Sequence, residues 1–142
     1  MISGTIAIDV EKKRRASRPR KPEKDRIPGG STLHPRYRIF HKGRIVLGPG
    51  KADLLEAIAR TGSIVKAARE LEMSYMRAWT LIGVMNESFR EPLVVAARGG
   101  TARGGADLSK FGERVLVMYR QIEQASLAAA AKDWKELKNC LC

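Results

Sequence analysis

Several features that other protein classes depend on are scarce in this chain of 142 residues. The two cysteines, Cys140 and Cys142, lie one residue apart, so they cannot link distant parts of a fold through disulfide bonds. Only two histidines occur, His34 and His41, and neither has neighbours with the spacing of a metal site. No apolar run approaches the length of about 18 residues that a membrane span needs. We therefore expect no disulfide framework, no metal site and no membrane segment.

Aromatic residues are also few, at 6% of the chain, although 44% of the residues are hydrophobic. A core made mostly of leucine, isoleucine, valine and alanine fits a small helical domain better than a β-sandwich. The sequence contains no arrangement of serine, cysteine, histidine and carboxylates that is typical of a catalytic site. We therefore expect neither an enzyme nor a bound cofactor.

Positive charge is abundant: 27 Lys and Arg residues against 15 Asp and Glu give a formal net charge of +12. Such a balance predicts a polyanionic partner, nucleic acid first and an anionic membrane surface second, or charge that only keeps the protein in solution. Residues 1–32 hold 9 basic and 4 acidic side chains and few large apolar ones after Val10. We expect a disordered basic arm there, which either contacts DNA phosphates or is a solvated extension.

The segment from Gly62 to Trp79 is the most informative part of the chain. Ser63 can cap a short helix with apolar residues at the i, i+3, i+4 and i+7 positions, namely Ile64, Ala67, Ala68 and Leu71. Ser74 can cap a second helix that begins at Tyr75. Two short helices joined by a tight turn indicate a helix-turn-helix, whose second helix enters the DNA major groove.

This second helix should run from Tyr75 to about Phe89. Its predicted inner face consists of Ala78, Leu81, Ile82, Met85 and Phe89, and its opposite face of Met76, Arg77, Thr80, Gly83 and Glu87. We expect the ring of Trp79 to be wedged between helices, because aromatic residues one turn into a helix usually are.

The flanking segments complete the predicted fold. We expect a hairpin over residues 37–47, a helix over 51–60, two strands over 93–97 and 106–108, and a long helix over about 109–138 that Ser109 can cap. The glycine-rich loop at 98–105 between the two strands would be a wing, with Arg98 and Arg103 for phosphate contact. The fold class is mainly α with small β-hairpins, a winged helix-turn-helix domain over residues 33–142.

Apolar residues recur along the long helix at alternating intervals of four and three. This heptad-like seam consists of Phe111, Val115, Met118, Ile122 and Ala125, and it continues to Ala129. Its first part must cover the domain core, and we expect its later turns to meet a second copy in a homodimer. The alternative is a helix that docks only on its own domain.

Several short stretches resemble the amino-terminal domain of ModE-type, molybdate-responsive transcription regulators. They are Leu47-Gly48-Pro49, Leu54 to Ile58, Thr61 to Ile64, Ala67-Ala68, Met73 to Tyr75, Ala78-Trp79, Met85-Asn86 and the glycine-rich segment ending at Ser109. The match covers about residues 36–125, and LysR-type regulators share a more distant helix-turn-helix. The resemblance implies a winged-helix homodimer that binds operator DNA. The chain departs from the family in its basic arm and in Ala96, where an arginine is common, and within this chain we expect no oxyanion-binding module.

We therefore expect a dimeric, sequence-specific regulator of molybdenum- or metal-related genes, acting on double-stranded DNA at a palindromic operator in the cytoplasm. Within this chain we expect no small-molecule ligand. The predicted DNA-binding residues are Ser74, Tyr75, Met76, Arg77, Thr80, Lys66, Arg98, Thr101 and Arg103, with Arg77 the foremost base or phosphate contact. The alternative is a winged-helix module that binds proteins and has no operator.

Overall fold

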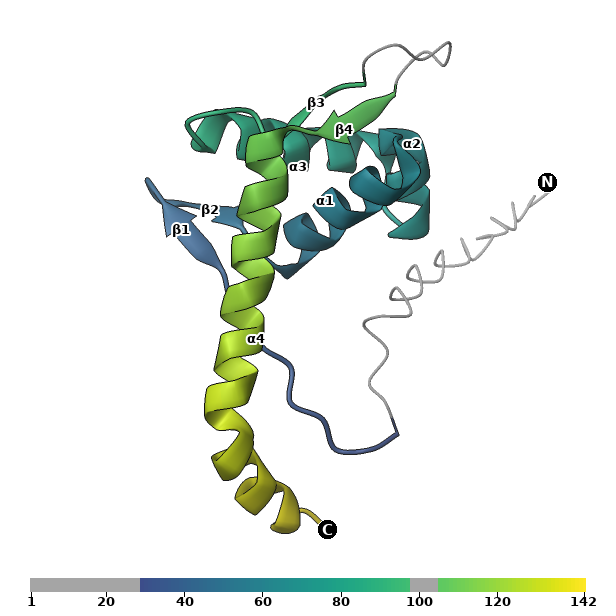
Figure 1. Ribbon diagram of the computed structural model, residues 1–142. Helices are drawn as coiled ribbons and strands as arrows, with labels where there is room; N and C mark the ends of the chain where they lie inside the picture. Colours follow the sequence, from purple (N-terminus) through teal and green to yellow (C-terminus); the bar gives the residue numbers. More distant parts are fainter. Residues whose placement is uncertain (1–28, 98–104) are drawn as a thin grey trace, which may run out of the picture.

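The computed structural model describes residues 29–97 and 105–142 (Figure 1). The elements follow in the order β1 (Ile39–His41), β2 (Arg44–Leu47), α1 (Pro49–Thr61), α2 (Ile64–Glu70), α3 (Tyr75–Ser88), β3 (Val94–Ala96), β4 (Ala106–Leu108) and α4 (Lys110–Asn139). The strands form two separate antiparallel pairs, β1 with β2 and β3 with β4. The predicted fold class, mainly helical with small hairpins, is confirmed.

The first hairpin turns through two residues with left-handed backbone conformation, Lys42 at φ 48° and Gly43 at φ 76°. Such a turn matches the twist of the flanking strands. The strand β1 begins at Ile39, two residues later than the predicted hairpin. The helix α1 begins at Pro49, two residues before the predicted start at Lys51, because proline suits the first turn of a helix.

Serine side chains begin three of the helices, as the sequence predicts. Ser63 Oγ accepts from the Lys66 N–H at 3.3 Å, Ser74 Oγ from the Arg77 N–H at 3.1 Å, and Ser109 Oγ from the Gly112 N–H at 2.9 Å. Each bond satisfies an amide that would otherwise lack a partner within its helix. The helix α3 ends at Ser88, so Phe89 lies one residue beyond it, with an extended backbone.

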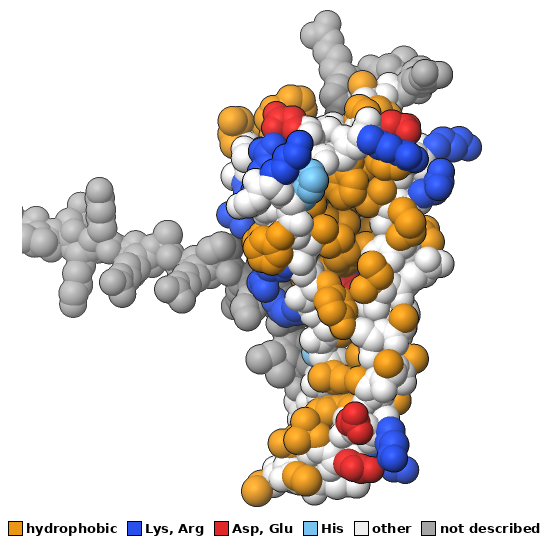
Figure 2. All heavy atoms as spheres, turned by 90° about the vertical axis from the view of Figure 1, so that its left-hand side faces the viewer, with side chains coloured by type: hydrophobic (Ala, Val, Ile, Leu, Met, Phe, Trp, Pro, Cys, Tyr) orange, Lys and Arg blue, Asp and Glu red, His pale blue; other side chains and the backbone are white. Residues whose placement is uncertain are grey.

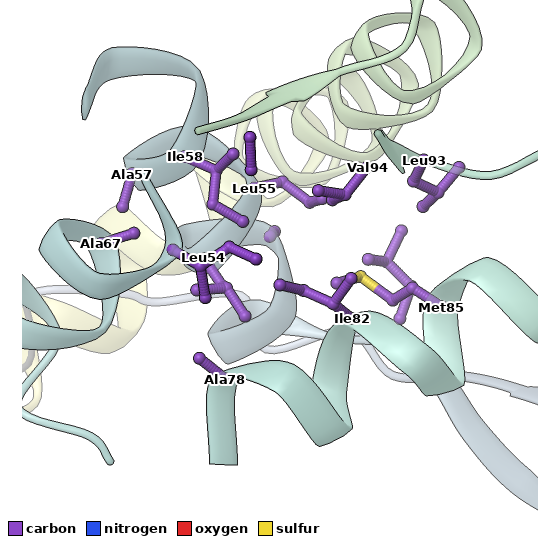
Figure 3. Packing of buried hydrophobic residues seen from close by; sticks show 14 of the residues in the cluster. Leu54, Leu55, Ala57, Ile58, Ala67, Ala78, Ile82, Met85, Leu93 and Val94 are labelled. Carbon is purple, nitrogen blue, oxygen red and sulfur yellow. The ribbon is translucent and has the colours of Figure 1, made fainter. Parts of the chain in front are cut away.

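The core is centred on α1, which buries five residues between the other elements: Ala52, Leu54, Leu55, Ala57 and Ile58 (Figure 3). Ala67 of α2 and Ala78 of α3 are fully buried in the same cluster. Their small side chains allow α2 and α3 to approach α1 closely. This packing fixes the angle at which α3 presents its outer face.

The second hairpin is attached to the helix-turn-helix at both of its strands. The Ala106 N–H donates to the Gly62 carbonyl at 3.0 Å, and Ser63 forms a β-bridge with Gly105. On the other strand, Asn86 of α3 accepts from the Leu93 and Val94 amides at 2.9 and 3.1 Å. The strands of the wing are therefore held against α2 and α3.

The long helix α4 docks its first half on this unit. Val115 and Tyr119 are buried, and Gly112 lies so close to Leu93 that an added Cβ would be 2.1 Å from the Leu93 carbonyl oxygen. The second half extends beyond the other elements (Figure 1). Among the residues that the structure describes, no helix combines the length and the apolar character that a membrane crossing requires.

Candidate nucleic-acid interface

The first turns of α3 form the outer edge of the helix-turn-helix. Five of the nine predicted DNA-binding residues lie exposed there, and they are Ser74, Tyr75, Met76, Arg77 and Thr80. The opposite side of the helix, at Ala78, Ile82 and Met85, is buried in the core. The amino-terminal half of α3 is thus available to a partner, as a recognition helix requires.

Trp79 corrects one expectation from the sequence, because its ring is not wedged between helices. The side chain is 55% exposed and stacks on Tyr75, with the ring centroids 6.2 Å apart and the ring planes 22° apart. Ala78 and Ile82 occupy the inner positions of α3, which turns Trp79 towards the wing. Tyr75 and Trp79 line a pocket of about 360 Å³ together with residues of α2 and of both wing strands.

Arg77 lies on the other flank of α3, where the helix faces the start of α1. It lines a pocket of about 230 Å³ with three further cations, Arg36, Arg38 and Lys51. Burial, and then the positive charge of Arg44, lowers the pKa of the Lys51 ammonium group. A set of cations around a shallow pocket beside a recognition helix suits a phosphate group.

Arg36, Arg38 and Lys51 were not among the residues predicted from the sequence. They lie well upstream of the helix-turn-helix, and the packing of both α1 and β2 against α3 brings them to Arg77. The sequence did indicate that the folded part of the chain has a basic surface, because its net charge outside the arm is positive. The net charge does not tell which residues form that surface.

Of the four remaining predicted DNA contacts, the structure describes one. Lys66 is exposed on α2, the first helix of the motif. Arg98, Thr101 and Arg103 lie outside the described residues, as does most of the predicted basic arm. Their contacts with DNA therefore stay predictions.

The predicted dimer seam divides into two parts along α4. Val115 is buried in the core, and Phe111 is partly buried against it, with its ring edge towards Phe89. Met118 and Ile122 are each 49% exposed, and Ala125 is exposed as well. Figure 2 shows hydrophobic side chains gathered along this face of the molecule, down the length of the projecting helix.

One polar cluster that sequence reasoning missed joins α4 to α1. The Arg120 guanidinium donates to Glu56 and Asp53, each at 2.7 Å, and to Glu123 at 2.9 Å. Burial disfavours the charged guanidinium, but the three carboxylates outweigh it and raise the pKa of Arg120. All three acids accept hydrogen bonds from this arginine, so the cluster orients α4 on α1.

Comparison with known proteins gives one family and several relatives. Residues 51–113 match the family model described as bacterial regulatory helix-turn-helix protein, lysR family. The chain is 49% identical over 77 residues to the molybdenum transport protein ModE of Azotobacter vinelandii, covering 54% of this chain and 28% of that protein. It is 34% identical over 93 residues to the DNA-binding transcriptional dual regulator ModE of Escherichia coli, covering 63% of this chain and 36% of that protein.

Among solved structures, the chain is similar to the crystal structure of the CbnR_DBD–DNA complex, with a TM-score of 0.45 and 20% identity. That similarity covers 61% of this chain and 92% of the other. The chain spans about a third or less of the length of its curated relatives, 36% for the one from Escherichia coli and 28% for the one from Azotobacter vinelandii. Residues 51–113 are therefore similar to the bacterial regulatory helix-turn-helix proteins of the lysR family, and the sequence is similar to that of ModE-type regulators, as its motifs predict.

Proposed function

We propose that this protein is a dimeric, sequence-specific transcription regulator that binds double-stranded DNA and has no catalytic role. The observation that carries the proposal is the exposed amino-terminal half of α3, presented by a helix-turn-helix and flanked by cations. Two relatives are named for molybdenum transport or for transcription regulation, which supports control of molybdenum- or metal-related genes. Such a regulator acts in the cytoplasm, where a bacterium keeps its DNA.

In the proposed complex α3 lies in the major groove, and its two flanks have different tasks. Arg77, with Lys51 and Arg38 beside it, binds a backbone phosphate and sets the register of the helix. The wing strands, held by hydrogen bonds to the start of α2 and to α3, lie next to the adjoining backbone. Phosphate contacts of this kind position the protein, whereas base edges supply the sequence preference.

A homodimer is the proposed assembly. The exposed residues Met118, Ile122 and Ala125 follow one another on a single stripe of α4, where an apolar surface lacks a partner within the described part of the chain. A second copy would cover this stripe with the same stripe, as twofold dimers do. Two recognition helices related by a twofold axis read a palindromic operator.

Selection of duplexes from a random library tests the proposal directly. The full chain should enrich one sequence with two inverted half-sites, and bind it about 1,000-fold or more tightly than unselected duplex DNA. A chain that binds all duplexes equally has no operator and would be a general DNA-binding or assembly module instead.

Arg77→Ala tests the role of the cationic flank. Since a phosphate contact is independent of sequence, the variant should lose affinity by the same factor on the selected operator and on unselected DNA, and its salt dependence should fall by about one phosphate contact. Fluorescence anisotropy at several salt concentrations measures both quantities. A loss confined to the operator would instead assign Arg77 to a base. Arg90→Ala is a matched control, because Arg90 is exposed beyond the end of α3 and packs over Phe111.

A further inference from the structure

The outward side of the recognition helix is mostly apolar. Met76 is 66% exposed, and Tyr75 and Trp79 expose 46% and 55% of their surfaces. We call these three residues the apolar strip. Large apolar side chains left open on a small protein usually mark a place where a partner binds. In a recognition helix that partner is the floor and wall of the DNA groove.

Two hydroxyl groups on the same turns are already engaged within the protein. Ser74 Oγ accepts from the Arg77 amide at 3.1 Å, and Thr80 Oγ1 donates to the Met76 carbonyl at 2.9 Å. Arg77 lies on the flank beside Arg38 and Lys51. Apart from the Tyr75 hydroxyl and the Trp79 indole N–H, the side of α3 that carries the apolar strip therefore has few side-chain groups that could read donors and acceptors on base edges.

Among the groups on the major-groove edges of the bases, the thymine 5-methyl is the apolar one. We propose that the apolar strip reads thymine, with the Trp79 ring as the main contact and Tyr75 stacked behind it as support. This inference rests on the proposed function, since it names the base feature that the proposed regulator recognises. The stacking of Tyr75 on Trp79 restrains the indole before DNA arrives, so less freedom is lost on binding.

The surroundings of the strip favour DNA as its partner. The pocket beside the strip is formed by α2, α3 and both wing strands, which are the parts of a winged helix that approach a duplex together. The cationic side chains of Arg77, Arg38 and Lys51 line the other flank, and they would bind the phosphate backbone while the strip lies against the bases. A duplex thus offers phosphates to the cationic flank of α3 and base edges to the apolar strip.

Replacing thymine by uracil in the selected operator removes one methyl group and leaves the hydrogen-bonding edge unchanged. For each methyl in contact with the strip, the wild-type chain should bind the uracil duplex about fourfold more weakly, since burying one such group contributes about 0.8 kcal/mol. In Trp79→Ala the ratio between the thymine and uracil duplexes should fall to about one at those positions. Trp79→Phe, which keeps an aromatic ring, should retain most of the ratio.

Phe40→Ala is the matched control, because Phe40 is an aromatic residue of β1 that is 67% exposed outside the strip. It should keep the wild-type ratio, whatever its overall affinity. An operator on which uracil replaces thymine at every position without loss overturns the inference and leaves the proposed function standing. If Trp79→Ala keeps the wild-type ratio between the affinities for the thymine and uracil duplexes, the inference is likewise overturned and the proposed function stands. A chain that enriches no sequence overturns both.

Discussion

Asn86 links the recognition helix to the wing through one side chain. Its Oδ1 accepts from the Leu93 and Val94 amides, and its Nδ2 donates to the Val94 carbonyl at 2.9 Å. A carboxamide can both accept and donate, which neither a carboxylate nor an apolar side chain of that size can do. These three hydrogen bonds therefore help to fix the orientation of β3 relative to α3.

Tyr119 performs a similar task between distant parts of the chain. Its hydroxyl donates to the Tyr37 carbonyl at 2.8 Å, which ties α4 to the segment before β1. Burial first, and then the negative charge of Glu123, raises the pKa of this phenol to about 12. The neutral phenol is thus the form that the folded protein favours.

This shift predicts a loss of stability at alkaline pH. Below pH 10, the ordinary pKa of tyrosine, both states keep the proton, so the full contribution is present. Between pH 10 and about 12 the unfolded chain releases the proton while the folded chain keeps it, which lowers the free energy of unfolding by roughly 1–2 kcal/mol. Urea denaturation at a series of pH values measures this. Tyr119→Phe should show a shallower alkaline decline, and an identical decline in both proteins would contradict the assignment.

The sequence predicted the roles of residues that interact with their neighbours in the chain. It did not predict the roles of residues that depend on contacts between distant elements. Ser63, Ser74 and Ser109 bond amides three residues ahead, so the sequence alone identifies them as caps. Arg120 meets Glu56 from 64 residues away, and no local pattern indicates that pairing. Trp79 belongs to the second kind, because the position of the wing and of Ile64 decides which side of α3 is open.

At the scale of the elements, the order of helices and strands was predicted correctly, and most ends lie within two residues of their predicted places. The differences have local causes. The helix α3 ends at Ser88 because Phe89 adopts an extended backbone and packs against Phe111 of α4. The sequence predicted that α4 docks through its apolar seam. It did not predict that α4 approaches the backbone of Leu93 most closely at Gly112.

Two helical glycines give a matched test of this docking. Gly112→Ala would place a Cβ 2.1 Å from the backbone oxygen of Leu93, so α4 must move away and the protein should lose about 2–3 kcal/mol of stability. Gly83→Ala on α3 meets no atom within 4 Å and should stabilise the helix by about 1 kcal/mol. Urea denaturation measures both. If Gly112→Ala is as stable as the wild type, α4 does not approach Leu93 this closely.

At the scale of the whole molecule, a single chain leaves one face of the projecting half of α4 uncovered, while the segment before β1 lies against Ser126, Leu127 and Ala130 on the same half. The helix has 30 residues and is therefore about 45 Å long, yet its buried residues, Gly112, Val115 and Tyr119, all lie in its first third. Figure 2 shows the hydrophobic side chains that remain on this face. The proposed dimer would account for a helix of this shape, because a second copy would cover this face.

Ile122→Lys tests the dimer. A lysine on the apolar stripe would bring two like charges together across the proposed twofold axis, so the variant should be monomeric at micromolar concentration, where the wild type should have the mass of a dimer. Gln121→Lys is the matched control, since Gln121 is an exposed neighbour outside the stripe. Light scattering gives the masses. A wild-type protein with the mass of one chain contradicts the proposed assembly.

Binding of the full chain to duplex DNA at increasing salt concentration tests the central claim most directly. The account predicts tight binding at low salt and a linear fall of log K with log salt, with a slope of about 0.9 for each phosphate that the protein neutralises. A slope corresponding to several phosphates would agree with a recognition helix flanked by Arg77, Arg38 and Lys51. A protein that stays unbound at low salt would contradict the account.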